Sequence, residues 1–116
     1  MSKKFAGRTY VVTGAARGIG LAVVKRLLNE GARVHACDID AISPNNMHTG
    51  LNFHLIDVRD EESVAKLFYS LKQSCEKING LVNNAAILDS TQFDELNSER
   101  IKEVLEINLG GTLNFT

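Results

Sequence analysis

Short apolar runs alternate with longer amphipathic stretches along this chain. The run from Thr9 to Val12 is β-branched and aromatic, which is typical of an interior strand. The stretch from Leu21 to Leu28 has apolar residues at helical spacing, and Gly31 follows it as a stop. The pattern therefore predicts a strand that passes through a turn into a helix.

The same alternation continues to the end of the chain. Further strands are predicted at 32–37, 51–56 and 78–86, and helices at 61–76 and from Asn97 or Ser98 onward. Asp60 is the expected cap of the helix at 61–76, because a carboxylate there can accept bonds from the first turn. The segment 41–50, which holds the only proline, and the polar segment 89–92 lack periodicity and are predicted loops.

Each of the two later helices carries an apolar stripe. The stripes consist of Val64, Leu67, Phe68, Leu71 and Cys75 in the first, and of Ile101, Val104, Leu105, Ile107 and Leu109 in the second.

Composition narrows the class of protein. The chain has 116 residues, of which 44% are hydrophobic and 23% charged, so residues 1–116 fit a single domain with a modest core. A net charge of -1 and the lack of a basic block argue against nucleic acid as the main partner. No run could span a bilayer or act as a secretory leader. We therefore expect no membrane partner.

Cysteine and histidine positions offer no framework for a disulfide or a metal. Cys37 and Cys75 have no pairing or ligand spacing, so we interpret them as reduced thiols and expect a cytoplasmic location. His35 falls on a predicted strand and His48 in a predicted loop, and neither has metal-ligating neighbours in the sequence.

The turn between the first strand and the first helix is rich in glycine. Gly14 permits the tight bend, Gly18 allows backbone to approach an anion, and Gly20 allows the helix to pack closely on the strand. The free amides and positive dipole of the helix start would then hold a pyrophosphate. A glycine-rich turn also occurs in ordinary loops, but the strand-turn-helix context favours a dinucleotide site.

The charge at the end of the second strand bears on which dinucleotide would bind. Asp38 lies about 20 residues beyond the glycine turn, where a carboxylate can accept bonds from the adenosine ribose and repel a 2′-phosphate. Asp40 is a less well placed substitute, and a solvated turn carboxylate is the alternative. Arg17 could instead pair with a 2′-phosphate. We give Asp38 more weight, so NAD is expected before NADP.

Polar residues also follow the later strands. Asp57 is a candidate for the adenine amino group, or else starts the next turn. Asn83 and Asn84 can tie a strand end to its neighbours with their amides. Asn108 interrupts an apolar helix, which favours either a functional amide or a bond between helices.

Together these features resemble the short-chain dehydrogenase/reductase family. They are Thr13-Gly14-Ala15-Ala16-Arg17-Gly18-Ile19-Gly20, Asp38, Asp57-Val58, Asn83-Asn84-Ala85-Ala86 and Asn108-Leu109-Gly110-Gly111. The resemblance implies an oxidoreductase that moves hydride between NAD(P) and an alcohol or carbonyl.

The resemblance also assigns roles to residues. Gly14, Gly18, Ile19 and Gly20 would bind pyrophosphate, with Thr13 bracing the turn. Asp38 would take the ribose, and Asp57 with Val58 the adenine. Asn84, Ala85 and Ala86 would line the nicotinamide side, although the motif usually ends in glycine where Ala86 stands. Asn108 would be the catalytic asparagine of an Asn-Ser-Tyr-Lys tetrad.

The match covers only the N-terminal half of a family member. The family's Tyr-x-x-x-Lys spacing is absent, since Gly14 stands four positions after Tyr10 and Gln73 four positions after Tyr69. We therefore expect this chain alone to be catalytically inactive. A non-catalytic dinucleotide- or protein-binding module and one half of a split enzyme remain alternatives.

The expected fold is α/β, a Rossmann-like parallel sheet of about four strands in the order 3-2-1-4 with helices on both faces. The fourth strand would then lie at an edge and leave apolar strand and helix surface uncovered. Such a surface predicts self-association or a partner chain.

Overall fold

A computed structural model of the chain describes residues 3–74, 76–86 and 97–116. Cys75 and the loop predicted at 89–92 lie outside the described residues. The elements in chain order are β1 (Thr9–Thr13), α1 (Gly18–Asn29), β2 (Arg33–Asp38), the 3-10 turn η1 (Pro44–Asn46), β3 (Leu51–Leu55), α2 (Glu61–Gln73), β4 (Gly80–Val82), α3 (Ser98–Leu105), the π-helical segment η3 (Glu106–Gly111) and α4 (Thr112–Phe115).

The strands form one parallel four-stranded sheet in the order β3-β2-β1-β4, which confirms the predicted order. In the register, Val11 of β1 lies beside His35 of β2, and Cys37 of β2 lies beside His54 of β3. β4 ends at Val82, earlier than predicted. The reason is that the Asn84 amide hydrogen bonds to the side chain of Thr13 at 3.0 Å and leaves the strand ladder.

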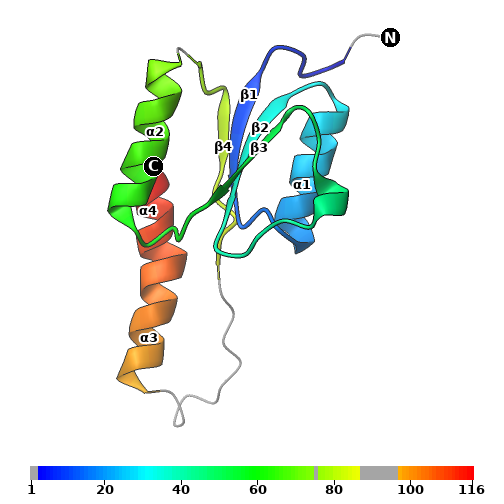
Figure 1. The fold of residues 1–116 in the computed structure, drawn as a ribbon. Helices are drawn as coiled ribbons and strands as arrows, with labels where there is room; N and C mark the ends of the chain where they lie inside the picture. The colour runs from blue at the N-terminus through cyan, green and yellow to red at the C-terminus, as the bar shows by residue number, and fades with distance from the viewer. Residues whose placement is uncertain (1–2, 75, 87–96) are drawn as a thin grey trace.

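Helices cover both faces of the sheet, with α1 on one face and α2 and α4 on the other (Figure 1). Two hydrophobic clusters follow from this arrangement. The α1 face contains Val12, Ala15, Val24, Leu28, Ala32, Val34, Ala36, Ile42 and Leu51. The α2 face contains Val11, Cys37, Ile56, Val58, Val64, Leu67, Leu71 and Phe115. Alternate residues of β1 and β2 therefore serve opposite layers, as the two-residue period of a strand requires.

The helix boundaries follow local chemistry. Asp60 caps α2 by accepting bonds from the amides of Glu62 and Ser63, at 3.1 and 3.2 Å, as predicted. Asn97 caps α3 in the same way, through the Arg100 amide at 2.8 Å. Side chains that satisfy the first free amides stabilise a helix start by about 1 kcal/mol each. Both starts were placed correctly from sequence.

The last helix is not one regular α-helix. Its axis extends beyond the carboxyl end of the sheet as α3 and returns beside α2 as α4 (Figure 1). Ile101, Leu105, Leu109 and Leu113 are exposed on it, because no described element covers that side. The predicted apolar stripe is therefore mostly surface.

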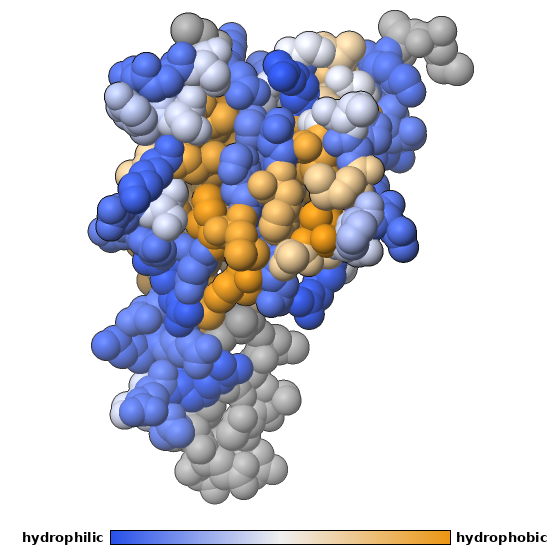
Figure 2. Space-filling model, viewed as in Figure 1, coloured by the Kyte–Doolittle hydropathy of each residue, from blue (hydrophilic) through white to orange (hydrophobic). Residues whose placement is uncertain are grey.

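Hydrophobic surface also gathers at the centre of the view in Figure 2, between α1 and the pair of α2 and α4. Ile39 and Leu55, just after β2 and at the end of β3, are among the exposed large hydrophobic residues. Within the described part of the chain no helix is long and apolar enough to cross a membrane.

Candidate functional site

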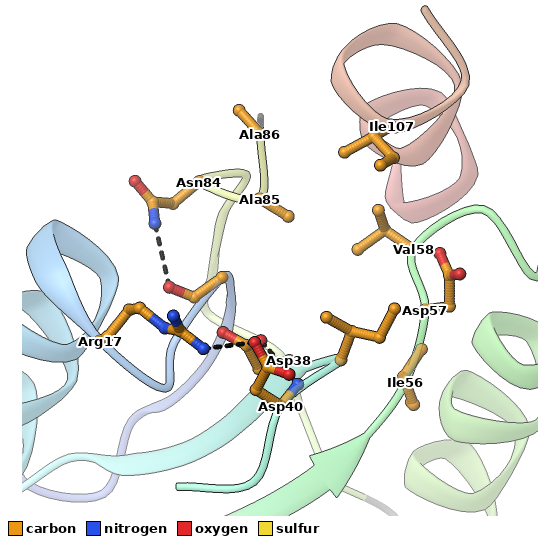
Figure 3. Close-up of a pocket in the computed structure, with 12 residues that line it drawn as sticks. Arg17, Asp38, Asp40, Ile56, Asp57, Val58, Asn84, Ala85, Ala86 and Ile107 are labelled. Atoms are coloured by element: carbon orange, nitrogen blue, oxygen red, sulfur yellow. Dashed lines mark hydrogen bonds and ion pairs between the residues drawn. The ribbon is translucent and has the colours of Figure 1, made fainter. Parts of the chain in front are cut away.

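A cleft of about 370 Å³ opens at the carboxyl ends of the strands. This is the edge of a parallel sheet where ligands bind in open α/β folds. Figure 3 shows Arg17, Asp38 and Asp40 on one side and Val58 and Ile107 on the other. The full lining is Gly14, Arg17, Asp38, Ile39, Asp40, Ile56, Asp57, Val58, Asn84, Ala85, Ala86 and Ile107.

The glycine turn has the geometry that its sequence predicts. Gly14 and Gly18 have φ angles of 63° and 60°, in the left-handed region that favours glycine. A Cβ on Gly20 would lie 2.0 Å from the carbonyl oxygen of Gly14 and 2.6 Å from the side-chain Nδ2 atom of Asn84. A Cβ on Gly18 would meet nothing within 4 Å. Gly20 is needed for packing, and Gly18 faces open space.

The start of α1 has no side-chain cap. Its N-cap residue is Arg17, which is extended (φ -157°, ψ 173°) and makes no side-chain capping bond. The first amides of a helix have no partner inside the helix, and its dipole places positive charge there. Because Arg17 lines the cleft, this helix start borders a space suited to an anion.

Thr13 braces the turn against the end of β4. The Thr13 hydroxyl oxygen accepts hydrogen bonds from the amides of Asn84 and Ala85, both at 3.0 Å. The Asn84 side-chain amide in turn donates to the Gly14 carbonyl at 3.1 Å (Figure 3). Thr13 is 1% exposed, so these bonds are shielded from water. Asn84 therefore has the tying role foreseen from sequence.

Asp38 connects the phosphate turn to the end of β2. One carboxylate oxygen accepts a bond from the Ala16 amide at 2.9 Å, and the other accepts from the Asp40 amide at 2.9 Å. The carboxylate is thus anchored at the cleft wall and is not a freely solvated turn residue. Each oxygen retains a lone pair for a further donor.

Asp57 is held by Arg59. The Arg59 side chain donates to both carboxylate oxygens, with its Nη2 2.7 Å from Oδ2, and the Arg59 amide lies 2.9 Å from Oδ1. The hydrogen bonds from the Arg59 side chain hold the pKa of Asp57 below its ordinary value. Asp57 therefore starts the following turn, the structural alternative considered from sequence.

The far wall of the cleft is apolar. Val58 and Ile107 line it, and they come from the segment after β3 and from η3. Asn114 of α4 fixes this segment by donating to the Val58 carbonyl at 3.0 Å. Gly111 packs directly on Val58, because a Cβ at position 111 would lie 2.3 Å from the Val58 Cγ2 atom.

Asn108 lies on η3 and is exposed, and it is not among the residues that line the cleft. Its carbonyl oxygen accepts a bond from the Thr112 hydroxyl at 3.1 Å. The helix around it is π-helical, a geometry that occurs often at functional sites. Its proposed catalytic role stays a prediction.

The sequence-predicted cofactor-binding residues therefore divide into two groups. Those that line the cleft are Gly14, Arg17, Asp38, Asp57, Val58, Asn84, Ala85 and Ala86. Thr13, Gly18, Ile19 and Gly20 shape the adjoining turn without lining the cleft, and Ile19 is exposed. Sequence reasoning did not assign Ile39, Ile56 or Ile107 to the site, because isoleucine at such positions also fits a core.

The chain is similar to known proteins over nearly its whole length. A family model described as short chain dehydrogenase matches residues 8–116. L-fucose dehydrogenase from Bos taurus is 32% identical over 120 residues, covering 100% of this chain and 44% of the relative. Sorbitol dehydrogenase from Cereibacter sphaeroides is 33% identical over 111 residues, covering 92% of this chain and 43% of the relative.

Two solved structures of dehydrogenases have a fold similar to that of this chain. A short chain dehydrogenase from Leptospira borgpetersenii with bound NAD+ has a TM-score of 0.90 and 26% identity, covering 95% of this chain and 43% of that one. A 4-hydroxyisoleucine dehydrogenase complexed with NADH has a TM-score of 0.82 and 29% identity, covering 93% of this chain and 46% of that one. The chain spans less than half the length of these proteins.

Proposed function

The chain belongs to the short-chain dehydrogenase family, and on that premise we propose that its cleft binds a nicotinamide dinucleotide, NAD in preference to NADP. The observation that carries the proposal is that Arg17 at the uncapped start of α1 and the anchored carboxylate of Asp38 line one cleft. Two structural neighbours are described with bound NAD+ or NADH.

The residues present fit such a cofactor. The free amides of α1 suit a pyrophosphate, and the lone pairs of Asp38 suit ribose hydroxyls. Ile56 and Val58 offer an apolar wall for adenine, while Ala85 and Ala86 leave room on the nicotinamide side. Bound there, the nicotinamide group would supply hydride chemistry, and the residues of this chain would position it.

The preference for NAD follows from charge. Asp38, Asp40 and Asp57 all line the cleft, so a 2′-phosphate would meet carboxylates at the ribose end. Arg17 is the cation that could offset them. In the structure Arg17 is paired with Asp40, which favours the uncharged ribose hydroxyl of NAD.

Calorimetric titration of the chain with NADH and with NADPH tests the proposal. We expect saturable binding that is tighter for NADH, and a loss of about tenfold for NADH in Asp38→Asn, which keeps the shape but not the charge of the side chain. The control is Glu62→Gln, which removes a carboxylate from an exposed pair with Lys66 on α2. A chain that binds neither cofactor contradicts the proposal.

We propose that the full protein is an oxidoreductase acting on an alcohol or carbonyl. We also propose that these 116 residues alone do not catalyse the reaction. The sequence lacks the Tyr-x-x-x-Lys spacing, which supports binding without catalysis. An assay of NADH formation with a panel of alcohols tests this. Turnover by the purified chain would overturn it.

Association with a second chain is part of the same proposal. Leu105, Leu109 and Leu113 are each more than half exposed, and among the described strands β4 pairs with β1 alone. Uncovered apolar surface and an open strand edge favour association. Light scattering tests this, and a monomer with a sharp melting transition would contradict it.

A further inference from the structure

Arg17 and Asp40 form an ion pair on one side of the cleft (Figure 3). The Nη2 atom of Arg17, from the phosphate turn, donates to Oδ2 of Asp40, from the loop after β2. Both residues line the cleft, and their side chains are 73% and 57% exposed. The pair is therefore accessible to a ligand and to solvent.

Arg17 is the one cation among the described residues that line the cleft. The other charged lining residues are the carboxylates Asp38, Asp40 and Asp57. Arg59 does not line the cleft and is committed to Asp57 through two side-chain nitrogens. A 2′-phosphate carries up to two negative charges and needs an arginine or lysine partner. A group that pairs with Arg17 therefore competes with the 2′-phosphate for this cation.

The side chain of Asp40 is separable from the scaffold of the site. The bond that Asp40 contributes to anchoring Asp38 comes from its backbone amide, at 2.9 Å, and a side-chain substitution leaves that amide in place. The carboxylate of Asp40 faces Arg17 on the surface, where an ion pair opens at little cost. The Asp40 carboxylate therefore favours one position of the Arg17 side chain but does not hold it there permanently.

We propose that Asp40 is a second determinant of cofactor choice, which acts by engaging Arg17 and so withholding it from a 2′-phosphate. The inference rests on the proposed function of the cleft and adds a residue to it. Asp38 discriminates by facing the ribose itself, whereas Asp40 acts through the arginine and is a positioning residue.

The test is calorimetric titration of NADH and NADPH into the wild-type chain, Asp40→Asn, Asp40→Glu and the double variant Arg17→Gln/Asp40→Asn. Asp40→Asn should raise the ratio of NADPH affinity to NADH affinity about threefold, since only NADPH carries the extra charge and an exposed ion pair contributes little. Asp40→Glu keeps the carboxylate and should keep the wild-type ratio. The double variant should lose the gain.

Salt and a matched control separate this effect from a general change in charge. The gain in Asp40→Asn should shrink in about 0.5 M NaCl, because the pair is exposed and screened. Glu62→Gln removes the same charge on α2 and should leave the NADPH to NADH ratio unchanged.

The outcomes distinguish the two proposals. Binding of NADH with no gain for NADPH in Asp40→Asn overturns this inference and leaves the proposed function standing. A gain that persists in the double variant also overturns it, because the effect would then not pass through Arg17. Failure of the wild-type chain to bind either cofactor overturns the proposed function and this inference with it.

Discussion

The Nε2 atom of His35 lies 3.0 Å from the Oε1 atom of Glu76. On its other side, Nδ1 of His35 lies 3.0 Å from Nε2 of His54, and the two rings stack with centroids 5.2 Å apart. His35 is 5% exposed, in the middle of β2. Among the described residues, no group of three or more His, Cys, Asp or Glu side chains could hold a metal ion. His54, His35 and Glu76 thus form a hydrogen-bonded chain, the histidine relay, which runs from β3 to the segment after α2.

This relay predicts acid destabilisation. Burial, and then the charge of His35, lower the pKa of His54 from 6.5, while the His35 hydrogen bond lowers the pKa of Glu76 from 4.5. Arg33 acts on Glu76 in the same direction. Both groups bind protons more readily in the unfolded chain, so their contribution to stability is present above the unfolded pKa values and is lost as pH falls. We expect the free energy of unfolding to fall as the pH drops below about 6.5, through His54, and to fall further below about 4.5, through Glu76.

Urea unfolding followed by circular dichroism at several pH values measures this effect. His54→Gln keeps a donor for His35 and should flatten the slope below pH 6.5. His48→Gln replaces an exposed histidine and should keep the wild-type slope. Equal slopes in all three proteins would contradict the assignment.

Cys37 should be unreactive in the folded chain. Burial, and then the negative charge of Asp38, raise the pKa of its thiol from 9.0 to about 12. The thiolate fraction near pH 8 is then about a thousandfold smaller than in the unfolded chain. In a Cys75→Ser background, labelling by a disulfide reagent should proceed only as fast as the chain unfolds. Rapid labelling without urea would show that Cys37 is accessible.

The same raised pKa has a consequence at alkaline pH. The unfolded thiol ionises above its ordinary value of 9.0 while the folded one stays neutral. The free energy of unfolding should therefore fall by up to about 1.4 kcal/mol for each pH unit above 9. Cys37→Ala should lose this dependence in urea unfolding between about pH 8 and pH 10. A dependence that survives the substitution would belong to other groups.

Local sequence rules were sufficient for much of the fold. The glycine turn, the cap at Asp60, the start of the last helix at Asn97 or Ser98 and the order of the strands were all predicted, because each depends on neighbours in sequence or on a general preference of parallel sheets. The helix at 61–76 was predicted too long, since it ends at Gln73. Glu76 is instead engaged by His35, a contact that residue spacing does not encode.

The site was less predictable where two distant segments meet. Asp57 was weighed equally as an adenine ligand and as a turn residue; its bonds with Arg59 show the turn role, and the adenine role stays a prediction. Residue spacing predicted no packing contact for Gly111, which packs on Val58, more than 50 positions away in the sequence. Such contacts arise from tertiary packing and leave no local pattern.

Thr13→Val should destabilise the chain by about 2 to 3 kcal/mol. Valine has the shape of threonine but no acceptor, so the amides of Asn84 and Ala85 would lose the oxygen that each contacts at 3.0 Å. Thr13→Ser keeps the hydroxyl and should cost about 1 kcal/mol for the lost methyl group. Urea unfolding measures both, and equal losses would show that the hydroxyl contributes little.

Two glycines of the turn should respond differently to alanine. Gly20→Ala places a Cβ 2.0 Å from the Gly14 carbonyl oxygen, which is backbone and cannot move aside without opening the turn. We expect a loss of about 3 kcal/mol or more in urea unfolding. Gly18→Ala meets no atom within 4 Å and carries only the strain of a φ of 60°, about 1 kcal/mol. A larger loss of stability in Gly18→Ala than in Gly20→Ala would contradict this geometry.

Gly111 and Gly110 provide a matched pair at the end of η3. Alanine is favoured over glycine in a helix by about 1 kcal/mol, so Gly110→Ala, whose Cβ would come no closer than 3.8 Å to the Leu105 carbonyl oxygen, should gain stability. Gly111→Ala should instead lose about 2 kcal/mol, because its Cβ would lie 2.3 Å from Cγ2 of Val58.

A double-mutant cycle locates the cause of that loss. Val58→Ala removes the Cγ2 atom and leaves Cβ at 2.8 Å, so Gly111→Ala should cost about 1 kcal/mol less in the Val58→Ala background. Since Val58 lines the cleft, Gly111→Ala should also weaken NADH binding, whereas Gly110→Ala should not. Calorimetry and urea unfolding of the four variants measure both effects. Additive losses would mean that η3 does not press on Val58, and the far wall of the cleft would then not depend on this glycine.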